Sequence, residues 1–420
     1  MAVRTSRSRS TTELIVRRCC AIGALLAVAL SWPAAASPRV ADAPPAAALA
    51  RALRSSGVAA GRTGALVLDL DDGTTVFGRN PDKPLAPAST ERLTVTLAAL
   101  QELGAGFRIE TAVLGSGSRS GRMWSGDLVL VGRGDPSLVR ADLRSLARQV
   151  RSLGIRSVTG RVLGDESYFD SRRTAPGWKS SFYKLESPPL SALVVDRAWL
   201  DRRVRDRPAL AAATAFRRAL HAAGVTVRGK PAGGTAPTGA VRLARVTSPP
   251  LSRLVDHMNT ESDNYYAEML LKQLGARELR LGTTAAGASV VRRVLAERGV
   301  PLAGVRIVDG SGLSRLDRLT VRALAALLRS AWNDHSIARP FKASLPIAGV
   351  NGTLEDRMRT GPARGVVRAK TGTTSLASAL AGYVGAGYVF GLLMNGNPVP
   401  YWSARTAQDR FVQRLARSLP

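Results

Sequence analysis

The chain has 420 residues, of which 45% are hydrophobic, and 60 Lys and Arg against 31 Asp and Glu give it a formal net charge of +29. Because a single hydrophobic core stops growing at about 250–300 residues, we expect more than one domain. The basic residues are scattered and aromatic residues make up only 5%, which excludes the interleaved basic and stacking pattern of a nucleic-acid-binding protein.

The first 36 residues have the pattern of a secretory signal peptide. Five arginines precede an apolar run at residues 21–30, which is too short for a mature membrane anchor, and three alanines at residues 34–36 offer a small-residue cleavage site. We therefore expect an exported chain that begins near Ser37 and acts outside the cytoplasm, in the cell wall or secreted; an uncleaved anchor is the alternative. Cys19 and Cys20 precede the apolar run, so the mature chain is predicted to have no disulfide and no Cys-based metal site.

The positive charge is carried almost entirely by arginine. Without residues 1–36, which hold five Arg and one Glu, 55 basic and 30 acidic residues remain, for a charge near +25. Only seven residues of the chain are Lys, a bias that an Arg-rich codon composition would explain. The functional alternative is attraction to anionic cell-wall polymers or to a membrane surface, and no nucleic-acid partner is expected.

A tether and a hairpin follow the signal. Residues 37–50 are rich in Ala and Pro and are predicted to be a tether that leads into a short helix ending near Gly57. Residues 64–70 alternate like a half-buried strand, a turn follows at residues 71–73, and residues 74–77 return. This pattern predicts a β-hairpin.

The next predicted helix begins at Ser89. Prolines up to Pro87 stop any earlier helix, and leucines then recur at helical spacing over residues 93–103 until Gly104. Ser89 therefore lies in the first turn, where its hydroxyl feels the helix dipole, and Arg92 shares its face. A serine that only caps the helix is the simpler alternative.

Residues 111–248 differ from the segments on either side in their predicted secondary structure. Short strand-like runs at residues 127–131 and 161–163 alternate with helices such as residues 209–223. No segment repeats at a fixed period, so a solenoid is not expected.

The chemical motifs lie on either side of this region. Ser89 and Ser262 are 173 positions apart. We therefore predict that residues 111–248 are an insertion within one catalytic domain, which residues 51–110 and 249–420 form.

The C-terminal part predicts helices and then strands. Helices are expected at residues 251–260, 265–274 (closed by Gly275), 285–298 and 407–419, and strands at residues 305–308, 366–373, 379–384 and 388–394. Together with the first hairpin, these elements predict an α+β fold with an antiparallel sheet of about five strands and helices on both faces.

Three short motifs occur in order along the chain: Ser89-Thr90-Glu91-Arg92, Ser262-Asp263-Asn264 and Lys370-Thr371-Gly372-Thr373. They match the S-x-x-K, S-D-N and K-T-G set of penicillin-binding proteins and serine β-lactamases, except that Arg92 stands where the set has Lys. The Ser262 triplet alone is also typical of a turn and N-cap. The order and spacing of all three favour function.

The chain resembles the low-molecular-mass class C penicillin-binding proteins, the D-alanyl-D-alanine carboxypeptidase/endopeptidase family of serine peptidases with a large inserted region. The resemblance rests on the three motifs and on further segments between them: Gly134-Asp135-Pro136, Gly164-Asp165, Ser191-Ala192-Leu193, Asp309-Gly310-Ser311-Gly312-Leu313-Ser314-Arg315 and Gly352-Thr353-Leu354. It implies a penicillin-binding/β-lactamase-like transpeptidase fold, with no cofactor and no metal.

The resemblance also implies a role for each motif. Ser89 would attack the bond between the two terminal D-alanines of a peptidoglycan stem peptide, and β-lactams would acylate it as inhibitors. Ser262 and Asn264 would relay a proton and hold the substrate amide. Lys370, with Thr371, Gly372 and Thr373, would form the site of the substrate carboxylate. The backbone N–H groups of Ser89 and Thr373 would form the oxyanion hole, in which one donor contributes about 3 kcal/mol.

Other hydrolase sites fit poorly. The three histidines, His221, His257 and His335, lack H-E-x-x-H spacing, and no serine lies in a G-x-S-x-G motif, which argues against a zinc peptidase and a Ser-His-Asp hydrolase. His257 is interpreted as a packing or surface residue of its helix. A second S-x-x-K, at residues 181–184, precedes prolines with no helix to follow and is interpreted as chance.

Two hypotheses remain, and Arg92 separates them. The first is a D-Ala-D-Ala carboxypeptidase/endopeptidase, slowed because arginine cannot accept the Ser89 proton and only Ser262 and Lys370 are left as a proton path. The second is a non-catalytic peptidoglycan-binding protein that keeps the pocket. A β-lactamase ranks third because the glutamates after Asn264 lack the context of a deacylating base: Glu268, Glu278, Glu297 and Glu355.

Overall fold

The computed structural model describes residues 46–419, and the predicted signal peptide lies outside these residues. Its central sheet has five antiparallel strands in the order β12-β13-β14-β1-β2. The strands are β1 (Thr63–Asp69), β2 (Thr75–Arg79), β12 (Val367–Thr373), β13 (Ala377–Val384) and β14 (Tyr388–Asn395). The predicted α+β fold, with its five-stranded antiparallel sheet, is therefore confirmed.

Alternating side chains of the strands enter two different cores. On β14, Val389 and Leu393 join one cluster of buried residues, whereas Phe390 and Leu392 join another on the opposite face. Successive side chains of a strand point to opposite faces of a sheet, and here both faces are covered. This explains why β13 and β14 are apolar almost throughout.

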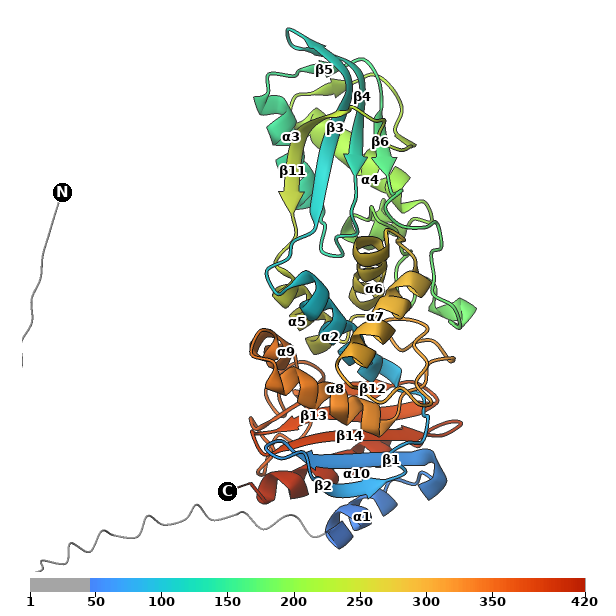
Figure 1. The fold of residues 1–420 in the computed structure, drawn as a ribbon. Coiled ribbons are helices and arrows are strands. Elements are labelled where there is room, and N and C mark those ends of the chain that lie inside the picture. Colours follow the sequence, from blue (N-terminus) through green and yellow to red (C-terminus); the bar gives the residue numbers. More distant parts are fainter. Residues whose placement is uncertain (1–45, 420) are drawn as a thin grey trace, which may run out of the picture. The chain divides into compact units, whose positions relative to one another are not determined.

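Helices cover both faces of this sheet, as Figure 1 shows for α8 and α9 on one side of the strands and α1 and α10 on the other. One core contains residues of α2 (Arg92–Leu103), α5 (Leu251–Thr260), α6 (Asn264–Leu279), α7 (Thr284–Glu297), α8 (Val321–Asn333) and α9 (Ala338–Ala343). The other contains residues of α1 (Ala46–Arg54) and α10 (Tyr401–Arg417). Helix α2 is buried from Arg92 to Leu100, including Arg92, Thr94 and Thr96, because it lies among the other helices of the first core.

A second sheet is formed by residues between Glu110 and Thr247. Its seven strands have a main path β10-β6-β4-β3-β11, in which β3 is antiparallel to its neighbours and β6 is parallel to β4. The strands are β3 (Glu110–Ser120), β4 (Met123–Val131), β5 (Ser157–Val158), β6 (Val162–Asp165), β9 (Thr226–Val227), β10 (Ala232–Gly233) and β11 (Val241–Thr247). Helices α3 (Arg140–Ser152) and α4 (Pro208–Ala222) close a third core against it, and β7 (Trp199–Leu200) pairs with β8 (Arg203–Val204).

Three predicted helix boundaries were wrong, since the C-terminal helix, expected at residues 407–419, runs from Tyr401 to Arg417. Helix α6 does not end at Gly275 but continues to Leu279, and Arg280 ends it in the left-handed conformation with a φ of 57°. Gly275 instead allows α7 to approach, because a Cβ there would lie 2.7 Å from the backbone nitrogen of Gly287. Residues 46–50, predicted as part of the tether, already belong to α1.

One predicted strand is absent. Residues 305–308 form no strand, and their pairing is limited to a single bridge between Arg306 and Arg318. Side-chain acceptors take over part of the backbone pairing instead, since Asp317 accepts the N–H of Val308 at 2.7 Å. Within residues 46–419, no helix has both the length and the apolar character needed to cross a membrane.

Candidate active site

Ser89 lies in a single 3₁₀ turn, η2 (Ala88–Glu91), directly before α2. Thr90 closes the turn by donating its hydroxyl to the carbonyl of Pro87 at 2.7 Å. Every residue from Arg92 to Leu100 is buried, so α2 is anchored in the core while Ser89 remains partly exposed at its N-terminal end. The predicted nucleophile is therefore held on a rigid support.

A glycine-containing loop at residues 309–314, here called the glycine loop, packs against this turn. Gly312 has a φ of 76°, and a Cβ there would lie 1.9 Å from the carbonyl oxygen of Ala88, so only glycine fits. The carboxylate of Asp309 shapes the loop by accepting the N–H groups of Gly312 and Ser314, both at 2.7 Å. The Trp178 indole donates to the same carboxylate at 2.7 Å and joins the loop to the region of the second sheet.

Ser262 and Asn264 lie at the junction of α5 and α6. Ser262 adopts a φ of 56°, an uncommon conformation for a residue other than glycine, and this turns the chain from one helix into the next. Asp263 is the N-cap of α6 and accepts the N–H of Tyr266 at 3.1 Å. Burial acts against the charged form of Asp263, but His257 and Arg197 hydrogen-bond to it and hold its pKa below the usual range.

Lys370 points from β12 to Ser262. Its ammonium donates to the Ser262 hydroxyl oxygen at 3.0 Å and to the Thr371 carbonyl at 2.9 Å, and its side chain is 0% exposed. Burial lowers the pKa of Lys370 well below its ordinary value, and the nearby Arg92 cation lowers it further. Lys370 is thus a buried lysine with a lowered pKa, in contact with the hydroxyl of Ser262.

Arg92 fills the space between Ser89 and Asn264. It is 0% exposed, and its guanidinium donates to the side-chain oxygen of Asn264, to the Asp263 carbonyl at 3.3 Å and to the Ser89 carbonyl at 3.4 Å. Burial lowers the pKa of Arg92 to about 10, while the negative charges of Asp263, Asp309 and Glu268 raise it. The guanidinium therefore stays charged near neutral pH, although no carboxylate of residues 46–419 forms an ion pair with it.

The motifs meet at one cavity of about 300 Å³. It is lined by Ser89, Ser262, Thr353, Arg357, Thr371, Thr373, Ser378, Tyr401 and Arg405. A Cβ at Gly372 would lie 3.1 Å from the backbone nitrogen of Ser89, so β12 passes close beside the nucleophile's turn. The structure thus brings together the predicted Ser89, Ser262, Thr371 and Thr373, whereas Lys370, Arg92 and Asn264 support them from outside this lining.

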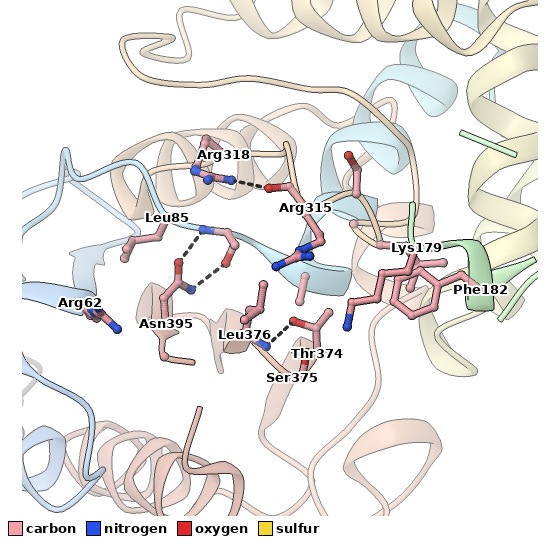
Figure 2. Close-up of a pocket in the computed structure, with 16 residues that line it drawn as sticks. Arg62, Leu85, Lys179, Phe182, Arg315, Arg318, Thr374, Ser375, Leu376 and Asn395 are labelled. Atoms are coloured by element: carbon pink, nitrogen blue, oxygen red, sulfur yellow. Dashed lines mark hydrogen bonds between the residues drawn. The ribbon is translucent and has the colours of Figure 1, made fainter. Parts of the chain in front are cut away.

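A second cavity, of about 290 Å³, adjoins the first at Ala88 and Thr374, the neighbours of Ser89 and Thr373. Figure 2 shows Arg315 and Lys179 pointing toward the turn that contains Thr374. Four basic side chains and no acidic ones line it: Arg62, Lys179, Arg315 and Arg318. Basic side chains therefore line both cavities, Arg357 and Arg405 in the first and these four in the second.

Comparison with known proteins identifies the family. The sequence profile of the D-Ala-D-Ala carboxypeptidase 3 (S13) family matches residues 46–209 and 198–418. The chain belongs to the S13 family. A D-alanyl-D-alanine carboxypeptidase of Actinomadura sp. (strain R39) is 32% identical over 84% of this chain and 81% of its own length. A carboxypeptidase of Mycobacterium tuberculosis is 33% identical over 83% of this chain and 77% of its own length.

The fold of this S13 protein is shared with a solved structure. Penicillin binding protein 4 (dacB) from Haemophilus influenzae has a TM-score of 0.78 at 22% identity, covering 88% of this chain and 98% of that one. The same protein in complex with a β-lactam has a TM-score of 0.70 at 23% identity, covering 89% and 98%. The predicted resemblance to the low-molecular-mass class C penicillin-binding proteins is confirmed.

Residues of the rejected sites lie elsewhere in the S13 fold. The second S-x-x-K is no helix start, because its serine belongs to the short 3₁₀ turn η3 (Ser180–Phe182) and Lys184 pairs with Asp206 at 2.6 Å. Among residues 46–419, no group of three or more His, Cys, Asp or Glu is arranged to hold a metal ion. His257, expected to be a packing or surface residue, contacts the Tyr266 ring and donates a hydrogen bond to the Asp263 carboxylate at 3.2 Å.

No described carboxylate lines the cavity at Ser89, which leaves the β-lactamase hypothesis without a deacylating base. Glu268 is buried behind α2, where its carboxylate accepts the N–H groups of Gly310 and Ser311 at 3.0 and 2.9 Å. Burial, with the charge of Asp309, raises the pKa of Glu268 to about 8. Glu268 therefore stabilises the glycine loop through these two backbone hydrogen bonds.

Sequence reasoning missed several residues of the cavity. Arg357, Ser378, Tyr401 and Arg405 carried no motif, and Thr353 was noted only as part of a family segment. Arginine is so common in this chain that Arg357 and Arg405 gave no signal. The Arg405 side chain reaches the cavity because α10 packs on the sheet beside β13, as the 2.9 Å hydrogen bond from Gln408 to Ser378 shows.

Proposed function

We propose that this S13 protein is a serine-type D-Ala-D-Ala carboxypeptidase/endopeptidase that cleaves peptidoglycan stem peptides through an acyl-enzyme on Ser89. The observation that carries the proposal is the 3.0 Å contact between the Lys370 ammonium and the hydroxyl of Ser262, beside the cavity that Ser262 shares with Ser89. It supplies a proton path that does not pass through Arg92. The proposal therefore accounts for a pocket that lacks the usual lysine.

Acylation would begin with proton transfer toward Lys370. The Ser262 oxygen takes the proton of Ser89 while Ser262 passes its own to neutral Lys370, which general base catalysis requires to have a lowered pKa. The Ser89 oxygen then bonds to the carbonyl carbon of the penultimate D-Ala. The backbone N–H groups of Ser89 and Thr373 would hold the oxyanion, a donor of this kind contributing about 3 kcal/mol.

Release would return the proton by the same path. As the peptide bond breaks, the leaving amine of the terminal D-Ala takes the proton through Ser262, and Lys370 becomes neutral again. Water then attacks the acyl-enzyme and gives a proton to the same pair, which passes it to the Ser89 oxygen as the ester bond breaks and the shortened stem peptide leaves.

Arg92 would act as a fixed cation in this scheme. It cannot accept a proton near neutral pH, but it holds the side-chain oxygen of Asn264 and favours neutral Lys370. Asn264 is thereby oriented with its amide nitrogen toward the carbonyl of Glu186, 2.9 Å away. The cationic second cavity, with Arg315 and Lys179, suits the carboxylate-bearing body of a stem peptide.

The alternative is a peptidoglycan-binding protein without catalytic activity. Arg92 favours this alternative because arginine cannot accept the Ser89 proton. Mass spectrometry after incubation with benzylpenicillin distinguishes the two. We expect a mass increase equal to one penicillin, lost in the Ser89→Ala variant. An unmodified wild-type mass after prolonged incubation would assign the protein to the non-catalytic class.

We also propose that residues 37–420 act outside the cytoplasm after removal of residues 1–36, and that residues 111–248 are the insertion. The pattern of residues 1–36 supports export, and the separate second sheet supports the insertion. N-terminal sequencing of protein from wall and culture fractions should give a start near Ser37. A chain still beginning at Met1 would argue for an uncleaved anchor.

Attraction to anionic wall polymers or a membrane surface is proposed from the charge of the mature chain, near +25. Long-range attraction of this kind is screened by salt, with a Debye length of about 8 Å at physiological ionic strength. Retention of the protein on purified walls should therefore fall as salt is added.

A further inference from the structure

The cavity at Ser89 needs a cation for the terminal carboxylate of the proposed substrate, and Lys370 is poorly placed to supply it. Its side chain is 0% exposed, and two of its three N–H donors already serve Ser262 and the Thr371 carbonyl. Its neutral form is also the one that the proposed proton path uses. The basic residues that line the cavity are Arg357 and Arg405.

Arg357 is already paired. Its guanidinium donates to the carboxylate of Asp409 at 2.9 and 2.5 Å and to the side-chain oxygen of Gln408 at 3.1 Å, and its side chain is only 4% exposed. A second carboxylate would therefore meet a charge that Asp409 has largely neutralised. Arg357 instead holds α10 in place, since it also donates to the backbone carbonyl of Arg405 at 3.4 Å.

Arg405 has a free charge at the same cavity. Its guanidinium donates to the hydroxyl of Tyr401, one helical turn earlier, at 2.8 Å. No carboxylate of residues 46–419 forms an ion pair with it. Tyr401 lines the same cavity, so the tyrosine contact sets the direction of the arginine while leaving its other N–H groups unused.

The hydroxyls around Arg405 complete a site for an anion. Thr371, Thr373 and Ser378 line the cavity with it. The Thr371 hydroxyl donates to the Thr353 hydroxyl at 2.8 Å, whereas the Ser378 hydroxyl accepts from Gln408 at 2.9 Å and keeps its own proton available. A guanidinium in a cavity lined by hydroxyl groups suits a carboxylate, which arginine can bind through two parallel hydrogen bonds.

We propose that Arg405, oriented by Tyr401, binds the C-terminal carboxylate of the substrate and makes the enzyme selective for peptides with a free carboxylate beside the scissile bond. This inference rests on the proposed function for the identity of the substrate. Arg405 is a specificity residue on α10, outside the three motifs. Peptides whose C-terminus is amidated or esterified lose the partner of Arg405 and should be poor substrates.

The test compares an acid with its ester in the Arg405→Met variant. Benzylpenicillin carries a carboxylate near its reactive carbonyl, and its methyl ester does not. The variant should be acylated by benzylpenicillin about 10- to 100-fold more slowly than the wild type, the loss expected for a charge-assisted hydrogen bond. Its rate with the methyl ester should equal that of the wild type. Arg410→Met, at an exposed position of the same helix, is the control and should react with both compounds as the wild type does.

The outcomes separate carboxylate recognition from other effects. Equal slowing with acid and ester would mean that Arg405 only supports the structure, and unchanged rates with both would overturn the assignment. If neither compound acylates the wild type, the catalytic proposal fails but this one is still tested. Calorimetry of an N-acyl-D-Ala-D-Ala peptide and its C-terminal amide should then show that Arg405→Met removes the preference for the acid; an unchanged preference would contradict it.

Discussion

Replacing Lys370 with methionine should slow acylation of Ser89 by benzylpenicillin about 10²- to 10⁴-fold, the contribution of general base catalysis. The buried ammonium contacts the Ser262 hydroxyl at 3.0 Å, and methionine keeps most of its volume without a titratable group. Stopped-flow or quenched single-turnover acylation gives the rate. Lys230→Met, an exposed lysine, should leave it unchanged, and thermal unfolding checks that each variant is folded.

A second variant shows whether Lys370 and Ser262 act as one path. Ser262→Ala should cost about as much as Lys370→Met, and the double variant should be little slower than either, because residues that act as a unit are not additive. If the two losses multiply instead, Lys370 and Ser262 serve separate functions, and the proton path proposed here is wrong.

The pH dependence follows from the lowered pKa of Lys370. Only the neutral amine accepts a proton, so the acylation rate should rise with pH through the pKa of Lys370 and level off above it. Because the Arg92 charge contributes to this lowering, removal of the charge in Arg92→Met should raise the pKa and move the rise to higher pH. Identical pH profiles would show that the two cations do not interact.

The fold and the motif residues could be predicted from the sequence because both are recognised from local patterns. Short apolar runs joined by a glycine-containing turn predicted β13 and β14, and the spacing of leucines predicted α2. The glycine at 275 misled the prediction, since a glycine that admits a neighbouring helix has the same local pattern as one that ends a helix. Residues 305–308 misled it because side-chain acceptors replaced the expected strand pairing.

The parts of the site that the sequence did not predict depend on contacts between distant segments. Lys370 and Ser262 are 108 positions apart, and nothing in either motif indicates that their side chains touch. Arg405 differs from the other arginines of α10 only by its position on the helix, one turn after Tyr401 and facing the cavity. The burial of Arg92 against Asn264 likewise follows from the packing of α2 on α6.

Arg92→Lys is expected to accelerate acylation, recovering part of the 10²- to 10⁴-fold that a direct general base contributes. A lysine here would lie in the same closed space, 0% exposed in the wild type, where desolvation lowers the pKa of an ammonium. Its amine could then take the Ser89 proton directly. The acceptors that hold Arg92 now, the Asn264 side chain and the Ser89 carbonyl, would orient it.

Arg92→Met supplies the comparison, because it removes the charge without supplying a base. It leaves the buried oxygen of Asn264 without its donor and removes the cation that favours neutral Lys370, so acylation should be slower than in the wild type. Single-turnover labelling with benzylpenicillin ranks the three proteins, with the lysine form fastest and the methionine form slowest. A wild type as fast as the lysine form would show that Arg92 is no handicap and that Lys370 alone serves as the base. Labelling of none of the three would leave a protein that holds a stem peptide in the cavity at Ser89 without cleaving it.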